Sequence, residues 1–384
     1  MKPATILAAA VLFACGDAAL AQQRAKPTDK GPIKVGAISS IALFPEATAA
    51  VRAYFDTVNA AGGIRGRKLQ LIVEDDKIEP ETAARAARKL IETDEVVANV
   101  GSASALECAV NAPYYSDKKM ISIQGTGVDP ACFDSPNIAP VNTGPYVGTA
   151  VALKFLADVR KRSRICAVVV AYAPSQKPAF ERVLGDWMKR SGRKLNYSAI
   201  GIAPTDDLAV HIKNALEVKC DGLVFTAIEP AVIAWVKAAR AMKAEGIDWV
   251  FLTPAYTQNV ADTLKTEGEG IYAISEFEPW SSRSGMLTDW RNVMTKGSVP
   301  LTSLSQGGYV AASVFVNVLR GIEGDISRES VTRAFKTLKE RKVPLMGTPF
   351  SFGQAAQHNP NRAAVPVRLD AGKWVVAHFD YITY

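Results

Sequence analysis

Histidine, cysteine and long apolar runs are all scarce in this sequence, and each scarcity excludes a class of protein. The 384 residues contain 3 histidines and 5 cysteines, and none of the cysteines stands in the C-x-x-C spacing typical of a zinc site. No G-x-S-x-G motif, phosphate-binding loop or dinucleotide-binding glycine motif occurs. Without a nucleophile–base pair, we expect no enzymatic activity, no cofactor and no metal.

The basic residues are spread along the chain rather than gathered in a run. The formal net charge is +7, but the sequence has no arginine-rich segment. We therefore expect no nucleic-acid partner. Beyond the N-terminus, no stretch reaches the ~20 apolar residues that a membrane span needs. The composition therefore favours a globular chain of two domains.

The N-terminus has the pattern of an export signal, and we expect a signal peptide at 1–21. Lys2 provides the positive charge, 4–14 is a short apolar run, and 19–21 reads Ala-Leu-Ala, a typical cleavage site. A second interpretation stays open, because the run ending at Cys15 loosely resembles a lipobox and would leave a lipid-anchored cysteine. Both interpretations predict export to the periplasm.

Export permits disulfides, and four cysteines follow the signal peptide. Cys108 falls in a predicted helix and Cys132 in the loop after the next predicted strand, so we predict a Cys108–Cys132 disulfide rather than two buried thiols. Cys166 and Cys220 stand at the starts of two strands that would be neighbours, and a second bridge is plausible there.

Short apolar runs alternate with amphipathic ones, which predicts an α/β fold with parallel sheets. One set of strands and helices extends from 33 to 123 and a second from 165 to 275, with a long helix around 146–160 between them. We therefore predict two doubly wound lobes. Two helical patterns after residue 300 fit neither set, so they either extend one lobe or mark a return of the chain to the first.

The residues that follow the strands are the candidate ligand site, because open parallel sheets bind ligands beyond the carboxyl ends of their strands. Ser102 and Ser104 have two open roles: they cap the next helix, or they accompany free N–H groups that hold a carboxylate. The acidic run 74–76 is expected to lie at a sheet edge or to cap a helix. The predicted ligand-binding residues are Phe44, Ser102, Ser104, Gln124, Thr126, Tyr172, Gln176, Glu229 and Tyr256.

Three segments carry a specific resemblance: IKVGAI at 33–38, NAAGGIRGRKLQLIVEDD at 59–76, and the late helix GYVAASVFVNVL. With them the chain resembles the leucine/isoleucine/valine-binding proteins, over about residues 31–384. The resemblance implies a periplasmic-binding-protein type I fold with a ligand cleft between two lobes. It suggests a first lobe of 31–144 plus 280–345 and a second of 145–279 plus 346–384. It also implies a monomer that closes on a small molecule and delivers it to the permease subunits of an ABC importer in the inner membrane, without chemistry.

The resemblance further implies that the turns at Ser102–Ser104 and Gln124–Thr126 hold a ligand carboxylate, with the glycines of QGTG letting the backbone approach it. One departure matters. Amino acid-binding members carry a glutamate after a strand-ending proline, to pair with the ligand ammonium, and Ala255 stands there in this chain. Glu229 is the remaining candidate for that pairing.

We therefore predict a small organic acid, aromatic rather than a branched-chain amino acid, as the ligand. Phe44, Tyr172 and Tyr256 would surround its ring, while Gln124 and Gln176 would bind a ring hydroxyl. Two other interpretations stay open: an amino acid- or amide-binding protein of the same importer type, and the ligand-sensing domain of a receptor.

Overall fold

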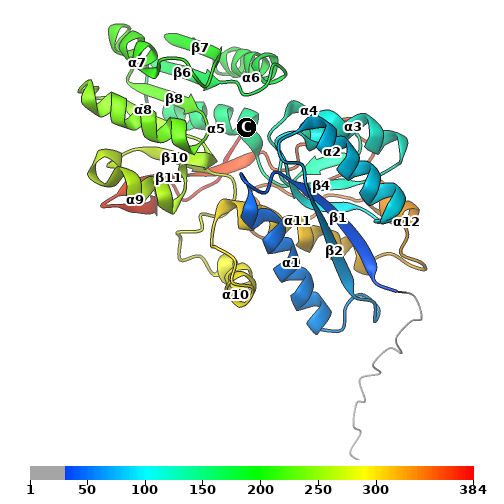
Figure 1. Ribbon diagram of the computed structural model, residues 1–384. Helices are drawn as coiled ribbons and strands as arrows, with labels where there is room; N and C mark the ends of the chain where they lie inside the picture. The colour runs from blue at the N-terminus through cyan, green and yellow to red at the C-terminus, as the bar shows by residue number, and fades with distance from the viewer. Residues whose placement is uncertain (1–30) are drawn as a thin grey trace, which may run out of the picture.

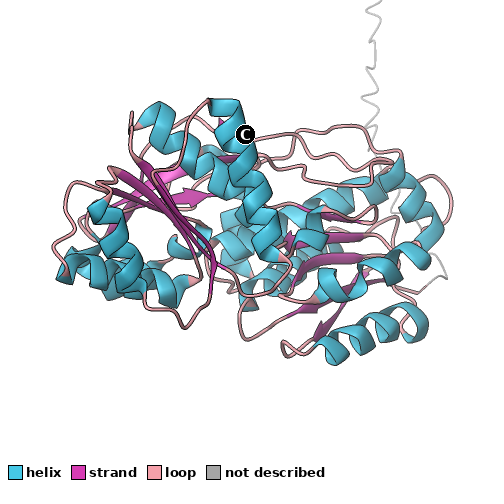
Figure 2. Ribbon diagram, turned by 90° about the horizontal axis from the view of Figure 1, so that it is seen from above, coloured by secondary structure: helices cyan, strands magenta, loops and turns pink. Residues whose placement is uncertain are grey.

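Two α/β lobes lie side by side in the computed structural model, which describes residues 31–384 (Figure 1). The predicted signal peptide at 1–21 and Cys15 lie outside the described residues. Seen from above, helices cover both faces of each sheet (Figure 2). Among residues 31–384, no helix combines the length and the apolar character needed to cross a membrane.

The sheet of the first lobe is parallel throughout, with the strand order β2-β1-β3-β4-β5. Its central strands are buried on both faces, because helices cover the two sides. The strands are β1 (Ile33–Ser39), β2 (Leu69–Asp75), β3 (Asn99–Ala103), β4 (Ser122–Thr126) and β5 (Ile138–Pro140). The helices between them are α1 (Pro45–Ala60), α2 (Pro80–Arg88), α3 (Glu107–Asp117) and α4 (Pro130–Phe133).

The second lobe holds a mixed sheet with the order β12-β11-β10-β9-β8-β6-β7, and β13 pairs with β11. The strands from β6 to β10 are parallel, as the strand–helix alternation predicted, but β11 and β12 run antiparallel to their neighbours. Sequence reasoning missed this C-terminal hairpin. The strands are β6 (Ile165–Val170), β7 (Tyr197–Ile202), β8 (Gly222–Thr226), β9 (Asp248–Phe251), β10 (Tyr272–Ser275), β11 (Ala363–Asp370), β12 (Lys373–Val376) and β13 (Ile382–Thr383). The helices are α5 (Gly144–Lys154), α6 (Gln176–Ser191), α7 (Leu208–Glu217), α8 (Glu229–Ala241) and α9 (Gln258–Leu264).

The late helices return to the first lobe, which decides between the two interpretations of that segment. Buried side chains of α10 (Thr288–Lys296), α11 (Ser303–Arg320) and α12 (Arg328–Lys336) share one apolar core with β1, β3 and β4. That core also includes Phe277 and Phe352. The lobe boundaries at 280 and 345 stay a prediction.

Glycines in β4 and α11 have a packing reason. A Cβ added to Gly307 would lie 2.2 Å from the carbonyl oxygen of Gly125, and one on Gly308 would lie 2.0 Å from that of Ala47. A side chain at Gly307 would force α11 away from β4, and one at Gly308 would force it away from α1. Gly125 of the QGTG turn thus serves helix packing, a role that the sequence alone did not indicate.

Three segments join the lobes, and Glu276 connects all of them. Its carboxylate oxygen Oε1 accepts hydrogen bonds from the Asn142 side chain at 3.1 Å and the Gly144 backbone at 2.7 Å. Its backbone carbonyl accepts from Asn361 at 2.8 Å. Burial raises the pKa of the Glu276 carboxyl, opposed by these hydrogen bonds. The hinge region is therefore a hydrogen-bonded unit rather than three independent linkers.

Candidate ligand-binding cleft

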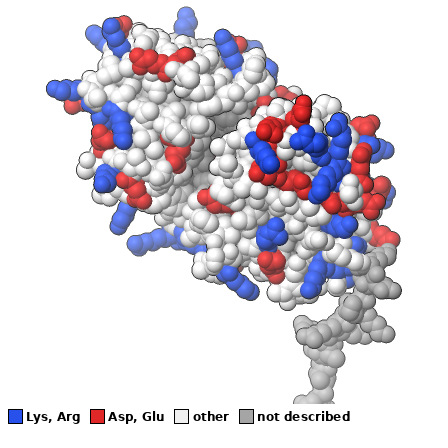
Figure 3. Space-filling model, in the orientation of Figure 1, with Lys and Arg blue, Asp and Glu red and all other residues white. Residues whose placement is uncertain are grey.

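The carboxyl ends of the parallel strands in both lobes face one another across a hollow. Ser175, in the loop after β6, reaches Asp129, in the turn after β4, with 2.8 Å between their side-chain oxygens. Figure 3 shows the surface hollowed between the lobes, with walls that carry few charged side chains. This is the place where α/β sheets of this kind bind ligands.

Asp76 organises the lobe 1 side of the cleft. Its carboxylate accepts hydrogen bonds from the hydroxyl of Ser40 at 2.9 Å, from the hydroxyl of Ser104, and from the backbone of Ile78 at 3.0 Å. It is fully buried. Three loops, after β1, β2 and β3, are thus held by one side chain. Sequence reasoning placed this acid at a sheet edge or a cap and did not connect it with the two serines.

Ser104 and Ser102 use their hydroxyls inside the lobe. Besides its bond to Asp76, Ser104 Oγ accepts from the backbone N–H groups of Leu106 at 3.0 Å and Glu107 at 2.7 Å, which is the capping role left open for it. Ser102 Oγ accepts from the Ile38 backbone at 3.0 Å. Both serines are buried, so they support the shape of the turn.

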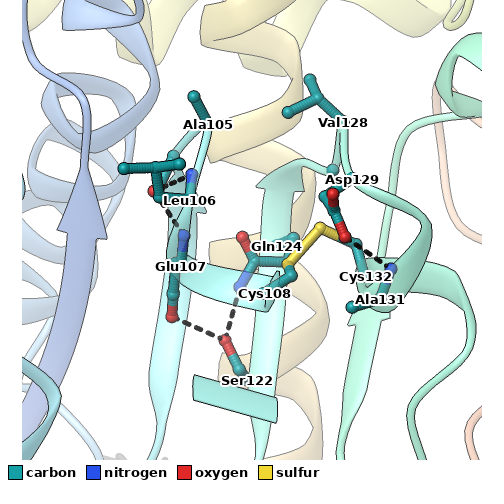
Figure 4. The surroundings of a disulfide bond; sticks show 12 residues. Ala105, Leu106, Glu107, Cys108, Ser122, Gln124, Val128, Asp129, Ala131 and Cys132 are labelled. Carbon is teal, nitrogen blue, oxygen red and sulfur yellow. Dashed lines mark hydrogen bonds between the residues drawn. A yellow bond between two sulfur atoms is a disulfide. The ribbon is translucent and has the colours of Figure 1, made fainter. Parts of the chain in front are cut away.

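Gln124 lies beneath the cleft, in a buried polar cluster next to the Cys108–Cys132 disulfide (Figure 4). Its amide donates to Ser122 Oγ at 2.7 Å. Two residues further, at the end of β4, Thr126 is partly exposed. Of the predicted residues on this strand, Thr126 therefore stands nearer to the surface of the cleft.

Glu107 is the acidic member of that cluster and is completely buried. Its Oε1 accepts from the Tyr115 hydroxyl at 2.7 Å and from Asn99 at 3.3 Å. Burial raises the pKa of the Glu107 carboxyl, and the hydrogen bonds lower it only in part. The carboxyl group is therefore biased toward its neutral form.

The predicted Cys108–Cys132 disulfide is present, and so is the Cys166–Cys220 bridge that the sequence left open. Cys108 of α3 is bonded to Cys132 of α4, and Cys166 of β6 to Cys220, just before β8. The first ties the short helix α4 to the lobe 1 helix beside it, and the second joins the two chain segments that lead into neighbouring strands. Each lobe thus has its own covalent link.

On the lobe 2 side, Tyr172 is held at the rim of the cleft with its ring 42% exposed. Its hydroxyl oxygen accepts from the Ile228 backbone at 3.1 Å, and its own N–H donates to Gln176 Oε1 at 2.8 Å. Burial of the hydroxyl raises the pKa of Tyr172, so the phenol stays protonated. Tyr172 and Gln176 thus lie together on the loop after β6, and their role in ligand binding stays a prediction.

Glu229 is engaged within its own lobe. Its carboxylate accepts from Thr257 Oγ1 at 2.6 Å and from the Asn259 side chain, both at the start of α9. Ala255, at the position where the resemblance implies a glutamate, is fully buried. Both carboxylate oxygens of Glu229 thus accept a hydrogen bond from the start of α9, and Ala255 carries no charge.

Tyr256 packs the lobe 2 side of the hinge. It is 1% exposed, stacks on Trp280 with 4.5 Å between ring centroids, and meets Trp374 edge-on. Its hydroxyl lies 2.7 Å from Ser281 Oγ. The ring therefore joins β9 to the second crossing segment, and Trp280 is an aromatic residue of this region that sequence reasoning missed.

Exposed apolar side chains gather at the rim loops of both lobes. In lobe 1, Ile41 and Leu43 are 40% and 46% exposed, in the loop that leads to the partly exposed Phe44. In lobe 2, Ile228 is 46% exposed beside Tyr172. These exposed side chains lie on loops that follow β1 in lobe 1 and β8 in lobe 2.

Two lobes with facing strand ends and a hollow between them define a bilobed binding protein. Residues 32–373 match the family of periplasmic binding proteins, and the chain belongs to that family. The family consists of extracytoplasmic binding proteins and not of enzymes. The membership confirms the resemblance to the leucine/isoleucine/valine-binding proteins.

Several solved structures share the fold at low sequence identity. A possible leucine/isoleucine/valine-binding protein from Rhodopirellula baltica is 18% identical, with a TM-score of 0.76 over 92% of this chain and 98% of that one. A solute-binding protein of an ABC transporter from R. palustris, in complex with 4-hydroxybenzoate, is 17% identical, with a TM-score of 0.76 over 92% and 97%. A branched-chain amino acid ABC transporter protein from Thermus thermophilus with bound valine is 15% identical, with a TM-score of 0.76 over 92% and 98%.

One relative is similar by sequence over a short stretch. An amino acid binding protein of Pseudomonas aeruginosa is 32% identical over 75 residues. The match spans 20% of this chain and 20% of that protein, so it says nothing about the rest of the cleft.

Proposed function

We propose that this chain is the periplasmic solute-binding component of an ABC importer, and that it captures a small organic acid with an aromatic body. As a monomer, it would close its lobes on the ligand and deliver it to permease subunits in the inner membrane. Family membership and the cleft between the strand ends support the binding role.

The proposed ligand class depends mainly on Glu229, whose carboxylate already accepts hydrogen bonds within lobe 2. An amino acid brings an ammonium group into the cleft, and burying it without a counter-charge is costly. The Glu229 carboxylate keeps its charge but is held at the start of α9 by hydrogen bonds from Thr257 and Asn259, and Ala255 offers no charge. The rim instead presents Tyr172 and Ile228, which suit a ring or another apolar body.

The structural neighbours are consistent with either ligand class. One was solved with 4-hydroxybenzoate and another with valine, at nearly the same likeness to this chain. Amino acid binding is therefore the second candidate, and Glu229 favours it if the carboxylate leaves Thr257 and Asn259 on closure. The choice between an aromatic acid and an amino acid therefore depends on the side chains of the cleft and not on the fold.

Calorimetry with benzoate, 4-hydroxybenzoate, cinnamate, leucine and valine separates these candidates. We expect an aromatic acid to bind, and at 100 times its dissociation constant to stabilise the protein by about 2.7 kcal/mol in a thermal-shift assay. Micromolar binding of leucine or valine, with no response to the aromatic acids, would overturn the proposed ligand class. The control Glu229→Gln should leave aromatic acid binding nearly unchanged.

A further inference from the structure

A second polar contact between the lobes lies outside the hinge, where the turn after β4 meets the start of α6. Ser175 Oγ donates to Asp129 Oδ2 at 2.8 Å, and Arg182 of α6 lies 3.5 Å from Asp134. The first of these contacts is well sheltered, since Asp129 is only 4% exposed. The second is open to solvent and contributes little.

Aromatic rings continue the contact toward the hinge. The ring of Tyr146, on α5, lies between those of Phe133 and Phe180, with centroid distances of 5.9 and 4.7 Å. The Tyr146 hydroxyl also donates to the carbonyl oxygen of Val128 at 3.2 Å. Helix α4 of lobe 1 thus packs against α5 and α6 of lobe 2.

Both carboxylate oxygens of Asp129 accept a hydrogen bond. Its other oxygen, Oδ1, accepts from the Ala131 backbone at 2.8 Å and begins α4. Helix α4 is in turn tied to α3 through Cys108–Cys132. Asp129 is therefore attached to lobe 1, whereas Ser175 is attached to α6 of lobe 2.

We propose that the Asp129–Ser175 hydrogen bond is a latch that holds this edge of the two lobes together. The hinge bonds of Glu276 join segments close to the chain crossings, so they survive a rotation of the lobes. The latch joins two side chains 46 positions apart, on separate lobes, and opening separates them. Asp129 is thereby a positioning residue that couples the Gln124–Val128 turn of lobe 1 to α6.

Hydrogen exchange of the full mature chain without ligand tests the latch. In Ser175→Ala, the amides of 128–134 and 176–182 should exchange about tenfold faster than in the wild type. That factor corresponds to ~1.4 kcal/mol, near the lower end for a hydrogen bond to a charged group. The matched control is Ser191→Ala, at the far end of the same helix, where the hydroxyl bonds only to Met188 and Arg193 nearby.

Two results would overturn the latch. Unchanged exchange in both segments of Ser175→Ala would show that the bond does not hold the lobes. Faster exchange spread evenly over both lobes would show that Ser175 stabilises the whole fold instead. Neither result depends on a ligand, so the latch and the proposed ligand class can fail separately.

Discussion

The two walls of the cleft are built differently. In lobe 1, the strand-end loops are polar and bonded to one another, with Asp76 holding Ser40 and Ser104. Both rims expose apolar side chains, Ile41 and Leu43 in lobe 1 and Ile228 in lobe 2, and lobe 2 adds Tyr172, which is 42% exposed. The difference teaches that hydroxyls at strand ends are not by themselves a ligand site. Lobe 1 supplies a hydrogen-bonded frame beneath its rim, and lobe 2 places Tyr172 at its rim.

The largest expected effect compares the covalent links of the lobes. Replacing Cys166 and Cys220 by alanine opens a loop of sequence separation 54 and should lower the free energy of unfolding by about 4 kcal/mol, whereas replacing Cys108 and Cys132, with separation 24, should lower it by about 3.5 kcal/mol. Urea unfolding of the two double variants measures both. A larger loss for the shorter loop would mean that strain or packing outweighs chain entropy.

Replacing Asp76 should destabilise the hydrogen-bonded strand-end loops of lobe 1. Asp76→Ala leaves the buried hydroxyls of Ser40 and Ser104 and the part-buried N–H of Ile78 without their acceptor, and the free energy of unfolding should fall by about 3 kcal/mol. The exposed neighbour Asp75 is the control, because Asp75→Ala should change stability by less than about 1 kcal/mol. Equal losses from the two variants in urea unfolding would contradict the special role of Asp76.

The buried acid of lobe 1 should make stability depend on pH. Because the folded pKa of Glu107 is raised, the folded state keeps a proton that the unfolded state releases above its ordinary value of 4.5. The contribution of Glu107 to the free energy of unfolding therefore falls as the pH rises above that value, at up to about 1.4 kcal/mol per pH unit. Urea unfolding at pH 5 and pH 7 should show a smaller fall for Glu107→Gln than for the wild type. The buried Glu276 keeps its own contribution in both proteins.

On the lobe 2 wall, the smallest effect concerns ligand binding. Tyr172→Ala should weaken binding of an aromatic acid about tenfold, since a ring contact contributes ~0.5–1.5 kcal/mol beyond burial. Tyr172→Phe should lose less, because it keeps the ring and gives up the bond from Ile228. Calorimetry compares both with Tyr197→Phe, whose hydroxyl bonds to His211 and Asn214 away from the rim. An unaltered affinity in Tyr172→Ala would remove Tyr172 from the site.

Much of the architecture follows from local patterns. Alternating strands and helices predicted two α/β lobes, and the positions of the cysteines predicted the Cys108–Cys132 disulfide while leaving Cys166–Cys220 open. The C-terminal hairpin β11–β12 escaped prediction, because its antiparallel pairing to β10 joins residues about 90 positions apart. The local pattern left the return of α11 to lobe 1 open, and only the resemblance to the leucine/isoleucine/valine-binding proteins predicted it.

By itself, the sequence determined which residues stand at the strand ends, because the period of the apolar pattern is a local property that fixes where each strand stops. Only the tertiary structure decided what those residues do. Ser104 bonds to Asp76, 28 positions earlier, and Glu229 to Thr257, 28 positions later. A hydroxyl or carboxylate takes whichever partner the fold brings within about 3 Å, and folding joins segments that no local pattern connects. Tyr172 and Ile228 remain at the rim because the lobe 2 helices leave their side chains uncovered.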